Sequence, residues 1–207
     1  MDLVAALCMA VASLGVSKSE KRTACRHMPY IVQQSAKQNI DPSLIVSMMF
    51  VESSFQKKVV SHANACGLMQ LIPKWNPVKI RGKKKFYTCE ELFHPRLNIR
   101  LGVKALKKWI RITRAESPPD APEGDALYRS VCAYNAGNVC RSRKRIKDPT
   151  KTRYVKKVLA SQKKLHDAMN HKAFGAKEII HCTVDVCPGT ACPCSYGEDK
   201  VLYFNYE

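Results

Sequence analysis

Long apolar runs and acidic residues are both scarce in this sequence. No uninterrupted apolar stretch reaches the roughly 18 residues that a membrane-spanning helix needs. The 207 residues contain 17 Asp and Glu against 35 Lys and Arg, a net charge of +18. The 45% of hydrophobic and 25% of charged residues are ordinary for a globular protein, which excludes a collagen, a low-complexity chain and wholesale disorder. The length allows one or two domains.

The positive charge is unevenly distributed. Residues 171–207 contain three Lys and five Asp or Glu, so the first 170 residues hold the remaining 32 basic and 12 acidic residues, a balance of +20. The segment 141–164 alone has eleven Lys or Arg and one Asp. Such a surface attracts polyanions, including cell-envelope polymers, nucleic acid and anionic membranes. The alternative is a solvated basic face with no single partner.

The N-terminus has features of an export signal. The stretch from Leu3 to Val16 is apolar with several small residues, although Asp2 is acidic and no basic residue precedes the run. Ten cysteines are typical of an oxidising compartment. We therefore predict a signal peptide over residues 1–17 and a periplasmic or secreted location; a buried or amphipathic first helix is the alternative.

Helical spacing of apolar residues dominates up to about residue 170. It predicts helices over 22–39, 42–53, 97–110, 126–134 and 152–169. The second of these is the clearest, because Asp41 is a good N-cap, Pro42 is a good first residue, and the helix is apolar almost all round. Residues 79–85 are expected to form a basic loop, and no strong alternating strand pattern occurs before residue 178. The predicted fold class is mostly α.

A different composition begins near residue 171. The tail, residues 171–207, is cysteine-rich and has strand-like apolar segments around 179–186 and 201–203. Its four cysteines favour disulfides in an exported protein. A zinc site built from three of them with His181 or Cys182 is the alternative, although the spacing lacks a C-x2-C pair. These cysteines are Cys182, Cys187, Cys192 and Cys194.

One acidic residue stands out in the body. Glu52 ends the apolar helix, and Leu44 and Met48 precede it at four-residue steps on the same face. A carboxyl group on an apolar face has a raised pKa, which suits a general acid. Glu52 is also the only Asp or Glu between Pro42 and Cys89, so no nearby residue offers the second carboxylate of a common glycosidase. The alternative is a helix-end Glu that simply reaches solvent.

Five blocks, in order along the chain, resemble the soluble lytic transglycosylase family. They are VESSF at 51–55, GLMQLIP at 67–73, NIRLGVKAL at 98–106, AYNAG at 133–137 and TRYVKKVL at 152–159. The resemblance covers about residues 28 to 165. It implies a lysozyme-like transglycosylase domain, which we place at residues 22–170.

The resemblance also implies roles for single residues. Glu52 would be the acid and base, and Tyr154 would donate a hydrogen bond that holds it in place. Gln70 would bind a sugar, and Ser61 would steady the reacting N-acetyl group. The groove would be lined further by Met69, for which a core position is the alternative, and by Tyr134 and Asn135.

The implied reaction is non-hydrolytic cleavage of the β-1,4 bond between N-acetylmuramic acid and N-acetylglucosamine, leaving a 1,6-anhydromuramic end. No metal or cofactor is expected. The expected partners are peptidoglycan glycan strands and anionic cell-envelope polymers rather than nucleic acid, and the expected state is a monomer. The alternatives are a hydrolytic muramidase of the same fold and a basic wall-polymer-binding module without activity. A phage-encoded wall-degrading protein fits the same pattern.

Three cysteines adjoin the motifs. Cys66 precedes GLMQ, while Cys132 and Cys140 bracket AYNAG. The two motifs face one cleft in the lysozyme-like fold, so a Cys66–Cys140 disulfide is the first expectation and Cys66–Cys132 the second. The other options are a free thiol or pairing with Cys25, Cys89 or the tail. Removal of Cys8 with a signal peptide would leave nine cysteines, an odd number.

Overall fold

The computed structural model describes the backbone of residues 2–173, 179–182 and 201–204, and the side chains of residues 2–170 except residue 80. Helices dominate it. The α-helices are α1 (Leu3–Ala10), α2 (Lys18–Gln38), α3 (Pro42–Ser53), α4 (Cys89–Leu92), α5 (Pro95–Ala115), α6 (Asp125–Ala136) and α7 (Arg153–Ala173). Short 3₁₀ turns are η1 (Val11–Leu14), η2 (Pro73–Trp75), η3 (Gly137–Arg141) and η4 (Pro149–Lys151). The mostly α class is confirmed, and none of the described helices combines the length and apolar character needed to cross a membrane.

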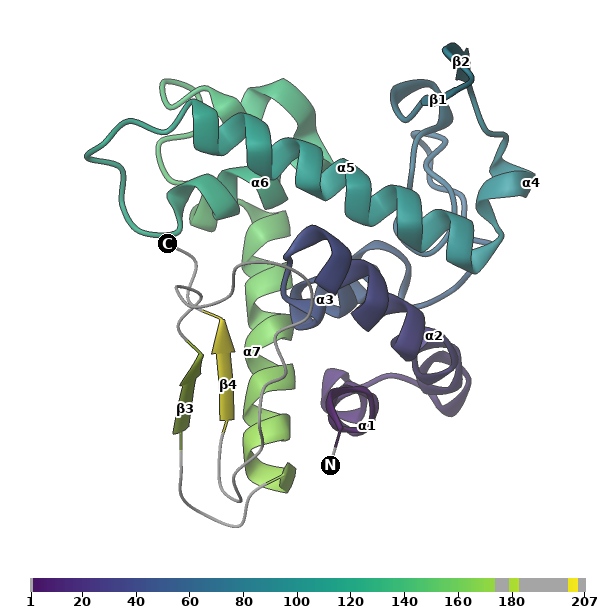
Figure 1. Cartoon of the computed structure of the whole chain (residues 1–207), viewed down its shortest axis with the longest axis vertical. Helices are drawn as coiled ribbons and strands as arrows, with labels where there is room; N and C mark the ends of the chain where they lie inside the picture. Colours follow the sequence, from purple (N-terminus) through teal and green to yellow (C-terminus); the bar gives the residue numbers. More distant parts are fainter. Residues whose placement is uncertain (1, 174–178, 183–200, 205–207) are drawn as a thin grey trace.

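Helix α3 occupies the centre of the fold. It lies beside α7, while α5 crosses the molecule and packs on α2 and α6 (Figure 1). Asp41 caps α3 by accepting a hydrogen bond from the Ser43 N–H, and Pro42 is its first residue, as predicted. Leu44 and Met48 are buried, at 1% and 0% exposure. Burial on nearly every side explains why a helix without an amphipathic stripe is stable here.

The first helix belongs to the same core. Leu7, Ala10 and Val11 are almost fully buried, and α1 packs on α2 and α7. A disulfide joins Cys8 to Cys25 on α2. The structure thus shows for this segment the buried helix that was the alternative to an export signal; cleavage after residue 17 stays a prediction.

The basic loop predicted at 79–85 is a β-hairpin instead. Strands β1 (Val78–Ile80) and β2 (Lys83–Lys85) pair antiparallel, with Ile80 opposite Lys83. The two residues between them, Arg81 and Gly82, have φ of 47° and 78°. Two-residue turns of this kind match the twist of paired strands. The sequence shows no clear strand alternation because β2 consists of three lysines and Arg81 is one of the two turn residues.

The described part of the tail is extended. Strands β3 (Ile179–Cys182) and β4 (Val201–Phe204) pair in parallel. The strand-like composition at 179–182 and around 201–203 is confirmed in these two segments. The tail disulfides, the alternative zinc site and Cys187, Cys192 and Cys194 lie outside the described residues, as does the side chain of Cys182.

The expected disulfides across the cleft are wrong. Cys66 is bonded to Cys89, with Cα atoms 5.5 Å apart, and Cys132 is bonded to Cys140 at 5.6 Å. Each disulfide therefore lies on one side of the expected cleft and does not cross it. The physical reason is local: the chain from Cys66 runs through the hairpin and returns to α4, which brings Cys89 within bonding reach before the chain enters the other wall.

Candidate active site

Glu52, from the first sequence motif, lies in contact with Tyr154 from the last. It lies in the last turn of α3 and is partly buried. Burial raises its pKa to about 7, while the hydrogen bond from Tyr154 acts in the opposite direction. The Tyr154 hydroxyl, from the first turn of α7, donates to Glu52 Oε1 at 2.6 Å. No charged side chain of the described residues contributes to this shift. A carboxyl group with a pKa near 7 can both donate and accept a proton at neutral pH.

The end of α3 is held in an unusual backbone. Ser54 and Phe55 follow Glu52 with φ of 49° and 61°, a left-handed region that non-glycine residues rarely adopt. Phe55 is 1% exposed, so its buried ring fixes this conformation. Ser53 donates a hydrogen bond of 2.8 Å to the carbonyl of Leu68. These contacts aim the end of α3 at the loop that carries the second motif.

That loop is built around a glycine and a buried asparagine. Gly67 has φ of 77°, and a Cβ there would lie 2.4 Å from Asn98 Nδ2. Asn98, on α5, accepts a hydrogen bond from the Met69 N–H at 2.8 Å and donates to the carbonyls of Cys66 and Leu92 at 2.9 and 2.8 Å. Sequence reasoning assigned Asn98 no role. The sequence signal that could have found it is an amide residue three positions before Leu101, on the apolar face of this helix. The structure buries Asn98 completely, and buried polar groups need hydrogen-bond partners.

Gln70 and Ser61 are both partly buried in this loop region. Gln70 has φ of 45°, and its amide nitrogen donates to the carbonyls of Val59 and Gly67 at 3.1 and 3.0 Å. Both N–H groups are thus engaged, which leaves the side-chain oxygen as the group that Gln70 can offer a ligand. The Ser61 hydroxyl accepts a hydrogen bond from the Ala65 N–H at 3.1 Å, so it closes a turn.

The other three expected groove residues occupy different environments. Met69 is fully buried, and a Cβ at Gly102 would lie 2.3 Å from its sulfur, so its placement favours the core alternative. Tyr134 donates a hydrogen bond of 2.7 Å to the Met69 carbonyl; burial and nearby Glu52 raise its pKa well above the usual value. Because the hydroxyl already donates its hydrogen bond, the ring of Tyr134 is the part that could contact a ligand. Asn135 is exposed beside it.

A second polar cluster ties the start of α3 to α7. Asp41 accepts hydrogen bonds from Ser43 at 2.6 Å and Gln162 at 2.8 Å, and His166 Nε2 lies 3.4 Å from the same carboxylate oxygen. Burial by itself would raise the pKa of Asp41, but the hydrogen bonds from His166 and Ser43 outweigh it and hold the pKa below its usual value. The sequence motifs did not indicate this cluster, because Gln162 lies 121 residues after Asp41 and His166 lies 123 residues after Ser43. With Tyr154 and Glu52, it joins α3 to α7 at both ends.

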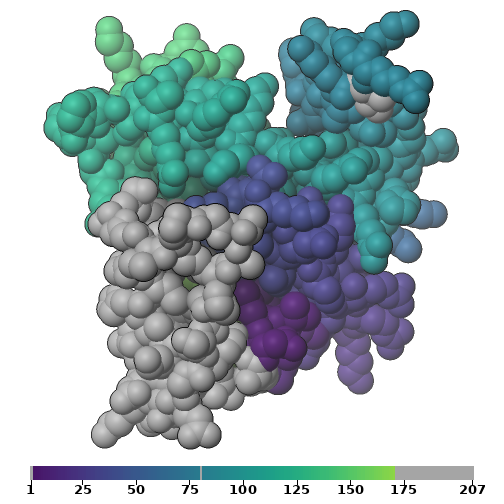
Figure 2. Space-filling view, viewed as in Figure 1, coloured from purple at the N-terminus to yellow at the C-terminus, as the bar shows by residue number. Residues whose placement is uncertain are grey.

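The residues around Glu52 come from two lobes of the surface. One lobe holds the 65–70 loop, the hairpin and α4; the other holds α6 and η3. Figure 2 shows a notch between them, with the 60–90 segment on one side and the α6–η3 region on the other. The hydrogen bond from Tyr134 to Met69 joins the two lobes. Among the described residues, no group of three or more His, Cys, Asp or Glu is placed to hold a metal ion.

This chain is similar in sequence to known proteins. The chain is 35% identical over 118 residues to a membrane-bound lytic murein transglycosylase C of Glaesserella parasuis, and 30% identical over 135 residues to one of Actinobacillus succinogenes. These matches span 55% and 64% of this chain but 31% and 37% of the relatives, so the chain spans about a third of their length.

An X-ray structure of an inactive mutant of the lytic transglycosylase Slt from Pseudomonas aeruginosa has the same fold, with a TM-score of 0.52. The two chains are 20% identical, and the match covers 73% of this chain and 25% of that one. The family model described as the transglycosylase SLT domain matches residues 29–157. Because this match spans more than half of the chain, the protein belongs to the transglycosylase SLT domain family.

Proposed function

We propose that this protein is a peptidoglycan lytic transglycosylase in which Glu52 is the single acid and base. It cleaves the β-1,4 bond between N-acetylmuramic acid and N-acetylglucosamine and leaves a 1,6-anhydromuramic end. The observation that carries the proposal is the partly buried Glu52, with a pKa near 7 and a hydrogen bond from Tyr154. The relatives named as lytic murein transglycosylases support the substrate class.

The reaction needs one group in two protonation states. Protonated Glu52 gives its proton to the bridging oxygen, and the bond to C1 of the muramic residue breaks through an oxocarbenium-like state. The resulting carboxylate then takes the proton of the muramic C6 hydroxyl while that oxygen bonds to C1. Tyr154 favours the carboxylate by donating to it, so it steadies Glu52 between the two steps.

Within the described residues, no charged group contributes to the pKa of Glu52, which supports the single-acid mechanism. A second carboxylate in a two-carboxylate glycosidase lies about 5 to 9.5 Å away. Such a charge would raise the pKa of Glu52 further, but its shift arises from burial, opposed by Tyr154. The substrate would lie in the notch, against the side-chain oxygen of Gln70, the ring of Tyr134 and the exposed Asn135.

The test is Glu52→Gln on purified peptidoglycan, with the products identified by mass spectrometry. An amide cannot donate the proton, so turnover should fall by about 10⁴-fold, the upper end of general acid–base contributions. Glu90→Gln is the matched control, because it makes the same chemical change at an exposed residue of α4. A Glu52→Gln variant that kept more than a tenth of the parent turnover would refute the assignment.

The products separate the proposal from its two alternatives. Anhydromuramic ends identify a transglycosylase, whereas reducing muramic ends identify a hydrolytic muramidase. Binding to peptidoglycan with no released fragments from the parent protein would identify a binding module. Either of the last two results would overturn the proposed reaction.

A further inference from the structure

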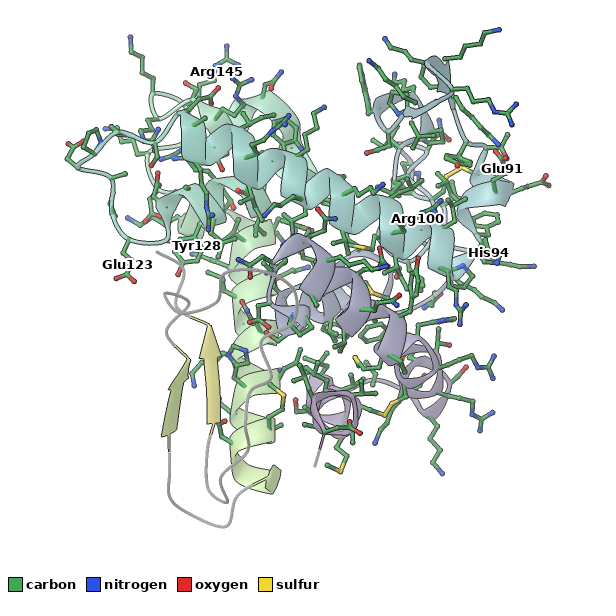
Figure 3. The ribbon with its side chains drawn as sticks, in the orientation of Figure 1. Glu91, His94, Arg100, Glu123, Tyr128 and Arg145 are labelled. Atoms are coloured by element: carbon green, nitrogen blue, oxygen red, sulfur yellow. A yellow bond between two sulfur atoms is a disulfide. The ribbon has the colours of Figure 1, made fainter. Side chains whose placement is uncertain are left out.

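The segment 74–87 carries none of the residues assigned to catalysis, yet it is strongly basic, with six Lys or Arg among its 14 residues. We call it the basic hairpin; it comprises η2 from Lys74 on, β1, β2 and residues up to Tyr87. Its six cations are Lys74, Lys79, Arg81, Lys83, Lys84 and Lys85, and no Asp or Glu lies between Glu52 and Glu90. Figure 3 shows long side chains with nitrogen ends pointing outward from β1 and β2.

The arrangement of these cations destabilises the hairpin itself. Lys79 and Lys84 are directly opposite each other across the two strands. Like charges in that position destabilise a strand pair. In the described part of the chain, the one ion pair of the basic hairpin is Lys85 with Glu91, at 2.9 Å. Apart from Lys74, which lies over the ring of Trp75, the remaining four cations have no ion pair or ring contact in the described part of the chain that would explain them.

The second basic run, 141–164, provides the contrast. Four of its eleven cations form ion pairs with carboxylates: Arg141, Arg143, Lys151 and Lys163. Arg143, for example, lies 2.6 Å from the buried carboxylate of Asp125. Several cations of that run therefore stabilise the fold through ion pairs. The basic hairpin has a larger share of unpaired cations, so it is the stronger candidate for binding an external anion.

Two aromatic side chains of the hairpin are exposed to solvent. Trp75 is 67% exposed and Phe86 is 54% exposed, and they are the only aromatics among the large exposed hydrophobic residues of the described chain. Soluble surfaces carry few exposed Trp and Phe beyond what function needs, so two of them in one short basic segment indicate an interaction site. Lys74 lies over the Trp75 ring, with Nζ 4.9 Å from its centre, so the exposed indole is accompanied by a cation.

The hairpin is held firmly at its base. The Cys66–Cys89 disulfide closes the segment that contains it, with a sequence separation of 23. A small core of Leu71, Leu92 and Leu101 lies beneath, with Tyr87 packed against it. The hairpin extends from the body at one end of the molecule (Figure 1). It therefore presents its charges and rings without ordering on contact.

We infer that the basic hairpin docks this protein on the surface of an anionic phospholipid bilayer. Charge alone fits any polyanion, but the pairing of basic side chains with exposed Trp and Phe matches the bilayer interface, where aromatic rings lie at the headgroup level and cations meet the phosphates. A sugar ligand is less well matched, because Lys74 lies over the indole ring that a sugar would stack on. This inference does not depend on the proposed reaction.

The first test measures partitioning of the full chain to vesicles of phosphatidylglycerol and phosphatidylcholine by co-sedimentation. The parent should bind the anionic vesicles, bind pure phosphatidylcholine weakly, and lose affinity as salt is raised. Lys83→Glu with Lys84→Glu should weaken binding at least about 25-fold, because each basic residue near an anionic surface strengthens partitioning about fivefold. The new Glu at 84 faces Lys79, so the strand pair should not be weakened.

The matched control is Lys104→Glu with Lys108→Glu, which makes the same change in net charge at two exposed positions of α5. It should weaken binding much less than the hairpin variant. Equal losses in the two variants would mean that net charge, not the hairpin, drives binding, and would overturn the inference. So would a parent protein that sediments with purified wall sacculi through the hairpin but not with anionic vesicles.

The second test reports directly on Trp75. The chain has two tryptophans, so Trp109→Phe leaves Trp75 as the only emitter. Its fluorescence should shift to shorter wavelength when phosphatidylglycerol vesicles are added, and should not shift with phosphatidylcholine. A spectrum unchanged by anionic vesicles that do bind the protein would place Trp75 away from the bilayer and refute this mode of docking.

Discussion

Replacing Glu52 by Gln should stabilise the fold in a pH-dependent manner, even though it abolishes the proposed activity. The pKa of Glu52 rises from 4.5 to about 7 in the folded protein. Between these values the unfolded chain loses the proton first, so the stability of the parent falls as pH rises through this window. At 1.36 kcal/mol per pKa unit, the full effect is about 3 kcal/mol.

The experiment is urea unfolding of parent and Glu52→Gln, followed by circular dichroism with the disulfides intact. At pH 4 the carboxyl group is protonated in both states, so the neutral amide should change the free energy of unfolding little. At pH 8 the variant should be more stable by about 3 kcal/mol, because it lacks the buried charge. A difference that is the same at pH 4 and pH 8 would show that burial does not raise the pKa of Glu52.

Three further changes test other parts of the structure. Tyr154→Phe removes the donor that favours ionised Glu52, so the pKa of Glu52 should rise and the alkaline limb of the pH–rate profile, where protonated Glu52 is lost, should move to higher pH. The substitution should also lower kcat more than it weakens glycan binding; an unchanged profile would leave Tyr154 a packing residue. Gly67→Ala would place a Cβ 2.6 Å from the last carbonyl of α4, so the melting temperature should fall. The control is Gly15→Ala, where φ is similar but no atom lies near the new Cβ; the fall for Gly67→Ala should be several degrees larger. Cys8→Ser should lower the free energy of unfolding by about 3 kcal/mol in the oxidised full-length chain, and no loss would mean that the first helix contributes little.

The helices could be predicted from sequence because their signals are local. Asp41 and Pro42 mark the start of α3, which has the predicted bounds. Apolar spacing marks α5 and α7, although both helices extend several residues beyond the predicted C-terminal ends. The hairpin could not be predicted in the same way. Its strands have three residues each, and its pairing depends on the turn at Arg81 and Gly82 rather than on an apolar face.

The same distinction between local and long-range signals applies to the residues of the site. Glu52 was indicated by its place on a buried face, and Tyr154 by resemblance; the structure brings the two within 2.6 Å. Asn98 and the Asp41 cluster were missed because key partners are distant in sequence: Cys66 is 32 residues from Asn98, and His166 is 123 residues from Ser43. Disulfide pairing failed for a related reason: it depends on which segments return to each other within one lobe, and neither spacing nor motif order specifies that.

The double attachment of α3 to α7 has a consequence for how the site would respond to a substrate. The Asp41 cluster fixes one end of the pair, and the Tyr154–Glu52 hydrogen bond fixes the other, while Ser53 and Tyr134 attach the inner loop. The groups proposed to move protons are therefore preorganised before any ligand arrives, and little reorganisation is needed during reaction. A glycan strand would therefore meet a site whose proton-transferring groups are already in place, and the helices that hold Glu52 would not need to close around it.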